Sequence, residues 1–234
     1  MRPVDLNDLA TVAARLEPLG VNFAFTGGAV VGFLLDNPLL PFPRQTDDVD
    51  AIVEVVTRIA YSDFEDRLRK EAGFRHDISE GAPTCRWIVG TVKVDIMPMR
   101  DPMGQFSNRW FEYALKTAAL RTFRGTSVNT VSATCFVATK LVAFDDRGKD
   151  DYTASHDLED ILTVVDGRKT LCDELTTERA DLREFVASRV AGLLVNPAFR
   201  EALPGHLESD NASQGRLPLL VERLRQIASL VKRS

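Results

Sequence analysis

Two glycines and two aspartates, about twenty residues apart, are the residues of this chain whose types and spacing best suit chemistry. Gly27 and Gly28 stand between an apolar run that ends at Phe25 and a second run with helical spacing. A glycine turn at the start of a helix presents backbone N–H groups to an anion, typically a phosphate. The pair therefore predicts a phosphate-binding turn, to which Thr26 can add a hydroxyl donor. The same residues would also serve as an ordinary tight turn.

Asp48 and Asp50 open the next apolar run, residues 51–56. Residues two apart on a strand share a face, so we expect both carboxylates on one side and Asp47 on the other, as a turn residue. Clustered carboxylates repel unless a cation offsets them, and Mg²⁺ binds one or two carboxylates together with phosphate oxygens. The alternative is a solvated acidic loop end. Arg44, just before them, is either a clamp on a triphosphate or a solvated arginine. Together these features suit phosphoryl transfer from a nucleotide.

The glycine pair, a spacer and residues 46–50 (Thr-Asp-Asp-Val-Asp) resemble the nucleotidyltransferase (DNA polymerase β-like) superfamily, and within it the AbiEii-type toxin nucleotidyltransferases most closely. The resemblance implies a third carboxylate on a later strand, and Asp95 in the apolar run 92–97 matches it. With Asp48 and Asp50, this residue would hold two Mg²⁺ ions, which Mn²⁺ can replace, and it would take the proton of the attacking hydroxyl.

Asp95 also has an interpretation without a metal. It lies among apolar residues, where an unpaired carboxylate would be costly. A salt bridge with Arg86, Lys93 or another base on the neighbouring strand would satisfy it equally.

The resemblance to the AbiEii-type group further implies a lysine on a following helix and then an acidic helix. Lys140 matches the lysine, which would contact the nucleotide phosphates as a catalytic residue. A lysine on an apolar helix can also extend its ammonium group from the edge of the core into water. Asp157 and Asp160 match the acidic helix, and their spacing puts them on one face. They would contact the nucleotide, orient Lys140 or cap local structure.

The pattern of apolar residues predicts an α/β half over residues 1–132, with a short mixed β-sheet, and an all-helical half over 133–234. The resemblance implies that the first is the nucleotidyltransferase core and that the second closes the nucleotide cleft. Short apolar runs predict strands at 21–25, 48–56, 74–78, 84–89, 91–97, 120–123 and 127–131. Helical spacing predicts helices at 5–19, 28–35, 62–72, 133–144, 155–166, 176–194, 197–203 and 214–232.

Composition limits the class of protein. The 234 residues suffice for a sizeable core, and no apolar stretch is long enough to cross a membrane. The chain begins with no signal-peptide pattern, and its three separated cysteines suggest neither disulfides nor zinc, so we expect a cytoplasmic protein. A net charge of −5 argues against a general nucleic-acid binder, although residues 121–124 are locally basic.

By resemblance, the expected activity is Mg²⁺-dependent transfer of a nucleoside monophosphate from an NTP to a hydroxyl of tRNA or another macromolecule. The protein would then be a toxin with a possible cognate antitoxin. Two alternatives remain: a small-molecule (aminoglycoside-like) adenylyltransferase, and a non-enzymatic nucleotide-sensing partner protein. Residues 106–111 form an unusual segment, in which Arg109 and Trp110 would stack on a base or fill a cleft between the halves.

Overall fold

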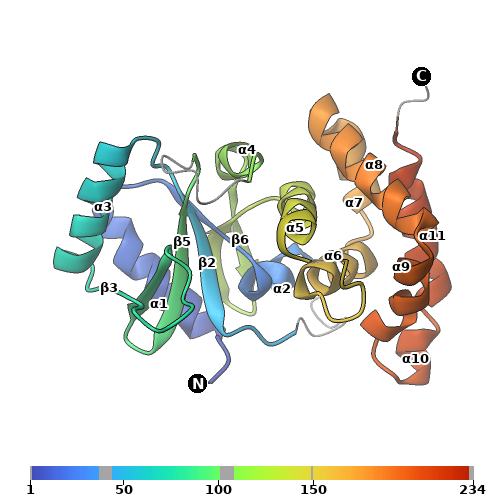
Figure 1. The fold of residues 1–234 in the computed structure, drawn as a ribbon, viewed down its shortest axis with the longest axis horizontal. Coiled ribbons are helices and arrows are strands. Elements are labelled where there is room, and N and C mark those ends of the chain that lie inside the picture. The colour runs from blue at the N-terminus through green and yellow to red at the C-terminus, as the bar shows by residue number, and fades with distance from the viewer. Residues whose placement is uncertain (1, 37–43, 101–107, 149, 232–234) are drawn as a thin grey trace. The chain divides into compact units, whose positions relative to one another are not determined.

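The computed structural model describes residues 2–36, 44–100, 108–148 and 150–231, drawn as a ribbon in Figure 1. These residues form two compact units. The first unit contains residues 2–33 and 44–132, and the second contains residues 34–36, 133–148 and 150–231. No helix in the described ranges is both long enough and apolar enough to span a membrane.

The first unit is built on a seven-stranded mixed sheet with the order β3-β4-β5-β2-β1-β7-β6. Strand β2 pairs in parallel with β5, β1 pairs in parallel with β7, and the other neighbours are antiparallel. This sheet confirms the predicted α/β class. The strands are β1 (Phe23–Thr26), β2 (Asp48–Val53), β3 (Arg75–His76), β4 (Arg86–Val89), β5 (Val92–Pro98), β6 (Ala119–Phe123) and β7 (Thr126–Thr130).

The two-residue period of a strand explains the burial along β2. Val49 and Ala51 are completely buried, whereas Asp48 and Asp50, which alternate with them, keep partial access to solvent. Beyond Asp50 every residue of β2 is buried, so the strand is apolar where it crosses the core and acidic only where it begins. The carboxylates therefore lie at the start of a strand that the core holds firmly.

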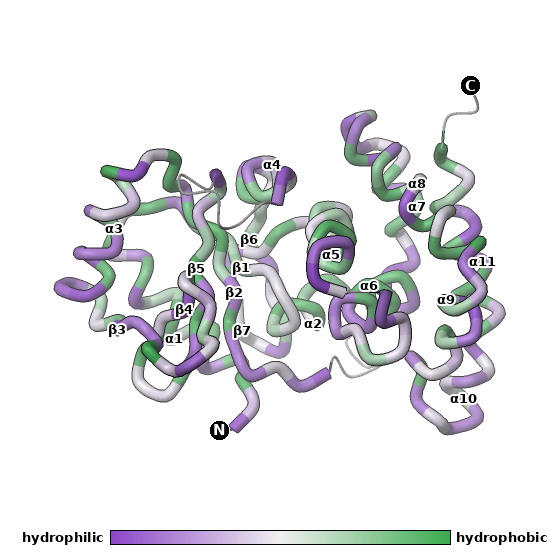
Figure 2. Tube along the Cα trace, viewed as in Figure 1, coloured by the Kyte–Doolittle hydropathy of each residue, from purple (hydrophilic) through white to green (hydrophobic). Residues whose placement is uncertain are grey.

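Capped amphipathic helices accompany the sheet: α1 (Leu6–Leu16), extended by a 3₁₀ turn at Glu17–Leu19, and α3 (Arg58–Lys70). Asp5 accepts hydrogen bonds at the N-terminus of α1, and Thr57 does so for α3. Figure 2 shows hydrophobic and hydrophilic residues alternating along α3. The helix α4 (Phe111–Lys116) was not predicted from the sequence.

The segment after the glycine pair differs from its prediction. The expected helix over 28–35 is a 3₁₀ turn at Gly28–Val30 followed by α2 (Val31–Leu34), a single α-helical turn. Such a short element has little aligned dipole, because the dipole of a helix sums over its peptide units. Close approach of the glycine backbone therefore matters more here than the field of a helix.

The second unit consists of helices, as the sequence predicted. They are α5 (Ala133–Arg147), α6 (His156–Gly167), α7 (Leu171–Thr177), α8 (Ala180–Val195), α9 (Pro197–Ala202), the 3₁₀ turn Leu203–His206, α10 (Asn211–Gln214) and α11 (Leu217–Ala228). The helix expected at 176–194 is divided, because Glu178 and Arg179 have extended backbone between α7 and α8. Helix α5 is buried along most of its length, as expected of a helix that is apolar on all sides.

Candidate active site

Strand pairing aligns four polar side chains in one row across the first unit. Asp50 of β2 is the register partner of Thr26 on β1 and of Asp95 on β5. Asp95 is in turn the register partner of Arg86 on β4. Asp48 lies two residues before Asp50 and therefore on the same face of the sheet. The three predicted carboxylates thus occupy adjacent strands on one face, although they come from distant parts of the sequence.

Gly27 lies directly against the carboxylate of Asp50. A Cβ atom built on Gly27 would be 1.8 Å from Asp50 Oδ2 and 2.6 Å from its Cγ, and the backbone φ is +72°. Both the contact and the left-handed backbone require glycine. The glycine turn and the acidic strand therefore belong to one site, with no room for a side chain between them.

Gly28 is close to the loop that precedes β2. A Cβ atom there would be 3.0 Å from a terminal nitrogen of Arg44 and 3.3 Å from the Thr46 side chain. The structure thus brings the glycine pair, Arg44 and the start of β2 together. Thr46 was not among the predicted site residues, but its hydroxyl donates a hydrogen bond to Asp48 Oδ1 at 3.1 Å.

Arg86 joins two of the three carboxylates. Its Nε and Nη2 each donate to an oxygen of Asp95 at 2.7 Å, and Nη2 also donates to Asp48 Oδ2 at 2.6 Å. The side chains of Arg86, Asp48 and Asp95 are 17%, 28% and 12% exposed. Hydrogen bonding to Asp95 raises the pKa of Arg86 despite the opposing effect of burial. Asp95 therefore has the salt bridge that was one of its two sequence-based interpretations.

These side chains suit a divalent cation by type and by position. Carboxylates are the ligands that Mg²⁺ prefers in proteins, and here they come from adjacent strands. Their present arrangement is a carboxylate–guanidinium cluster. Among the described residues, no three His, Cys, Asp or Glu side chains are grouped to hold a metal ion.

Lys140 of α5 belongs to a buried ionic cluster in the second unit. Its ammonium nitrogen lies 3.0 Å from Asp157 Oδ1 and 2.7 Å from Asp160 Oδ2, both on α6. The lysine is 7% exposed, so its charged end is enclosed and does not extend into water. The three residues expected to act together in this half are therefore in direct contact.

Arg147, at the end of α5, completes this cluster. Its Nε and Nη2 donate to the two oxygens of Asp157 at 2.9 and 2.8 Å. Burial by itself would raise the pKa of Asp157, but the hydrogen bond from Arg147 and the charges of Lys140 and Arg147 outweigh it and lower the pKa to about 2. Asp157 is consequently ionised throughout the physiological range.

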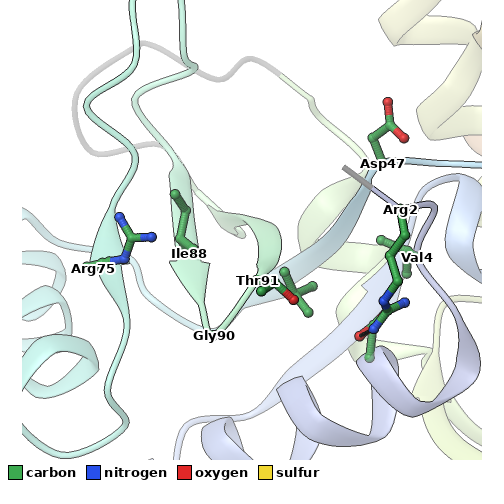
Figure 3. Close-up of a pocket in the computed structure, with 9 residues that line it drawn as sticks. Arg2, Val4, Asp47, Arg75, Ile88, Gly90 and Thr91 are labelled. Atoms are coloured by element: carbon green, nitrogen blue, oxygen red, sulfur yellow. Dashed lines mark hydrogen bonds and ion pairs between the residues drawn. The ribbon is translucent and has the colours of Figure 1, made fainter.

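A cavity of about 530 Å³ opens elsewhere on the first unit (Figure 3). Arg2 and Arg75 lie on opposite sides of it, with the turn at Gly90 and Thr91 between them. Asp47 also lines it, whereas none of the residues predicted to bind nucleotide or metal does. This cavity is therefore not the predicted phosphate site, and Arg2 on its wall is paired with Asp8.

In the segment 106–111, Phe106 and Ser107 lie outside the described residues. Trp110 is 4% exposed, and the Arg109 guanidinium carbon lies 4.9 Å from the centre of its ring. An indole this enclosed has no open face on which a base could stack, so base stacking does not fit Trp110.

Of the residues that the sequence did not assign to the site, Arg86 is the most important. It was named only as one of several bases that could satisfy Asp95. Its signal was its position: it lies on the strand before β5, and a short hairpin turn brings that strand back beside Asp95. Antiparallel pairing of the two runs across the turn at Gly90 predicts this contact.

Comparison with known proteins supports the fold. No protein-family model matches the sequence, and no curated protein is a significant match. Among solved structures, an antigenic nucleotidyltransferase-like protein from Paracoccidioides brasiliensis is 20% identical and aligns over 96% of this chain and 95% of its own, with a TM-score of 0.50. ANT(2")-Ia in complex with adenylyl-2"-tobramycin is 12% identical over 79% of this chain and 95% of its own, with a TM-score of 0.48. The similarity to the Paracoccidioides protein gives this chain a nucleotidyltransferase-like fold.

Proposed function

We propose that this protein is a divalent-metal-dependent nucleotidyltransferase that moves a nucleoside monophosphate from an NTP to an acceptor hydroxyl. The observation that carries the proposal is the contact between Gly27 and Asp50, with Asp95 beside Asp50 in register. A backbone turn able to approach phosphate and a set of carboxylates able to hold a cation then share one site, in a fold that is nucleotidyltransferase-like.

The roles follow from position. Gly27 and Gly28 seat the β- and γ-phosphates, with the hydroxyl of Thr26 and the guanidinium of Arg44 as further donors. Asp48, Asp50 and Asp95 are the ligands for Mg²⁺ or Mn²⁺. A metal held by these residues would activate the acceptor hydroxyl and offset the charge that grows on the leaving group.

Transfer of the nucleoside monophosphate is an in-line displacement. The acceptor oxygen forms a bond to the α-phosphorus, the bond between that phosphorus and the oxygen leading to the β-phosphate breaks, and pyrophosphate leaves. Asp95 receives the proton of the acceptor hydroxyl. By resemblance, Lys140 is also proposed to contact the nucleotide phosphates, and its ion-pair partners Asp157 and Asp160 are proposed to orient its ammonium group.

For the acceptor we propose tRNA or another macromolecule, on the resemblance to the AbiEii-type toxins, which would make the protein a toxin with an antitoxin partner. Fold alone does not fix a substrate, so the acceptor is settled by experiment. Incubation with each labelled NTP, and either a tRNA pool or a panel of aminoglycosides, should label the macromolecular fraction. Label on the aminoglycosides would contradict this choice and make the protein a small-molecule adenylyltransferase.

Asp50→Asn tests the site itself. Loss of one charge from the carboxylate set should reduce the single-turnover rate by about 100-fold or more, on the scale of removing a group that stabilises a transition state. The matched control is Asp47→Asn, because Asp47 is exposed and precedes the strand. Wild-type rates in a folded Asp50→Asn protein would remove the site. Nucleotide binding without turnover in the wild type would favour a nucleotide-sensing protein.

A further inference from the structure

Arg86 lies between Asp48 and Asp95, two of the three proposed metal ligands. Three of its hydrogen bonds reach both oxygens of Asp95 and Oδ2 of Asp48. The remaining oxygen, Asp48 Oδ1, accepts from the Thr46 hydroxyl. All four carboxylate oxygens of this pair are therefore engaged. A cation that approaches Asp95 from the side of the guanidinium must displace at least one of these bonds.

Partial burial of the cluster makes the Arg86 guanidinium difficult to replace. The side chains of Arg86, Asp48 and Asp95 are between 12% and 28% exposed, so water screens their charges only in part. A guanidinium that grips one carboxylate with two nitrogens is among the strongest of protein hydrogen-bonding arrangements. Without Arg86, the facing carboxylates of Asp48 and Asp95 would repel each other.

We propose that Arg86 is the built-in counter-cation of the acidic site: it positions Asp48 and Asp95 while no metal is bound, and it competes with divalent metal for the same oxygens. The proposal rests on the proposed function, since it takes those carboxylates as metal ligands. Arg86 thereby keeps the metal-free site intact and lowers its affinity for metal alone. Metal delivered with a nucleotide has the advantage, because phosphate oxygens supply further ligands.

Titration with Mn²⁺, followed by the electron paramagnetic resonance signal of free Mn²⁺, measures this competition without nucleotide or activity. Arg86→Gln removes the charge and should tighten Mn²⁺ binding about 10- to 100-fold, the range expected of charge-assisted hydrogen bonds. Lys93→Gln is the matched control. Lys93 lies on the same face of β5, in register with Asp48, but forms no ion pair with Asp48 or Asp95 within the described chain. Its substitution should change affinity less than about threefold.

Thermal unfolding provides the second readout. In EDTA, Arg86→Gln should melt below the wild type, since the carboxylates then face each other uncompensated. Added Mn²⁺ should raise its melting temperature more than that of the wild type. If Arg86→Gln does not fold, Arg86→Lys takes its place, because it keeps the charge but cannot grip Asp95 with two nitrogens. Its affinity for Mn²⁺ should be higher than that of the wild type.

The possible failures are distinguishable. If the wild type binds Mn²⁺ and the Arg86 variants bind it equally or more weakly, Arg86 is not a competitor, and the metal site and the proposed function stand. If Lys93→Gln raised the affinity for Mn²⁺ equally, a change in net charge would explain the effect, and the specific role of Arg86 would be overturned. If neither the wild type nor the variants bind Mn²⁺, these carboxylates are not a metal site, and both proposals fall.

Discussion

Lys140→Met tests the buried ionic cluster of the second unit. The lysine nitrogen lies 3.0 Å from Asp157 and 2.7 Å from Asp160. Methionine keeps an unbranched, flexible apolar chain in its place, so the change removes mainly the charge. Arg147 still holds Asp157 after the substitution. Most of the energetic cost therefore arises at Asp160, whose side chain is 2% exposed and loses its ion pair with Lys140.

Burial sets the size of the effect. Removing one partner from a buried ion pair costs about 3–5 kcal/mol. We expect Lys140→Met to lower the free energy of unfolding by about 3 kcal/mol, the low end of that range, because Arg147 still neutralises part of the charge. The control is Lys116→Met. Lys116 pairs with Glu112 at 2.6 Å, but its side chain is 63% exposed, so its loss should cost less than about 1 kcal/mol.

Urea unfolding followed by far-ultraviolet circular dichroism measures both variants against the wild type. The double variant Lys140→Met/Asp160→Asn should recover part of the loss, because the amide removes one of the two buried carboxylate charges that Lys140 offset. A loss of less than about 1 kcal/mol for Lys140→Met, equal to that of the exposed control, would refute the buried cluster. Lys140 would then be a lysine that reaches water from the edge of the core.

Two further predictions concern a backbone contact and a titration. Gly27→Ala should displace the Asp50 side chain and weaken Mn²⁺ binding. The control Gly81→Ala, at φ +76° with nothing within 4 Å, introduces backbone strain but no such contact. Equal Mn²⁺ affinities of the two variants in calorimetry would contradict the contact between Gly27 and Asp50. The lowered pKa of Asp157 means that its contribution to stability is complete above the unfolded value of 3.8 and is lost as pH falls toward 2, by about 2 kcal/mol. Arg147→Gln should raise the pKa of Asp157 and reduce this loss of stability at low pH. The free energy of unfolding, measured in urea between pH 5 and pH 2, would show that Arg147 has no such role if it fell equally in the variant and the wild type.

Features that depend on neighbouring residues were predictable. The start of β2 at Asp48 and the common face of Asp48 and Asp50 follow from the two-residue period of a strand. The change from strands to helices after residue 132 follows from the change in apolar spacing. The predicted ends were less accurate: the strand expected at 21–25 is β1 at Phe23–Thr26, since pairing partners decide where a strand stops.

Only the tertiary structure decided which side chains meet. Nothing in the separation of residues 50 and 95 states the register of β2 with β5, because hydrogen bonds between strands distant in the sequence set it. That register turns Arg86 from one possible base into the bridge between Asp48 and Asp95. It also requires glycine at position 27, where the Asp50 carboxylate leaves no space for a side chain.

The same division holds in the second unit. The sequence determined that Lys140 lies on an apolar helix and that Asp157 and Asp160 share one face of the next. Whether the lysine points to water or into the protein depended on the packing of α5 against α6, which encloses its charge between two carboxylates. Local periodicity decides which face a residue occupies, and only the partner packed on that face decides its solvation and hence the chemistry open to it.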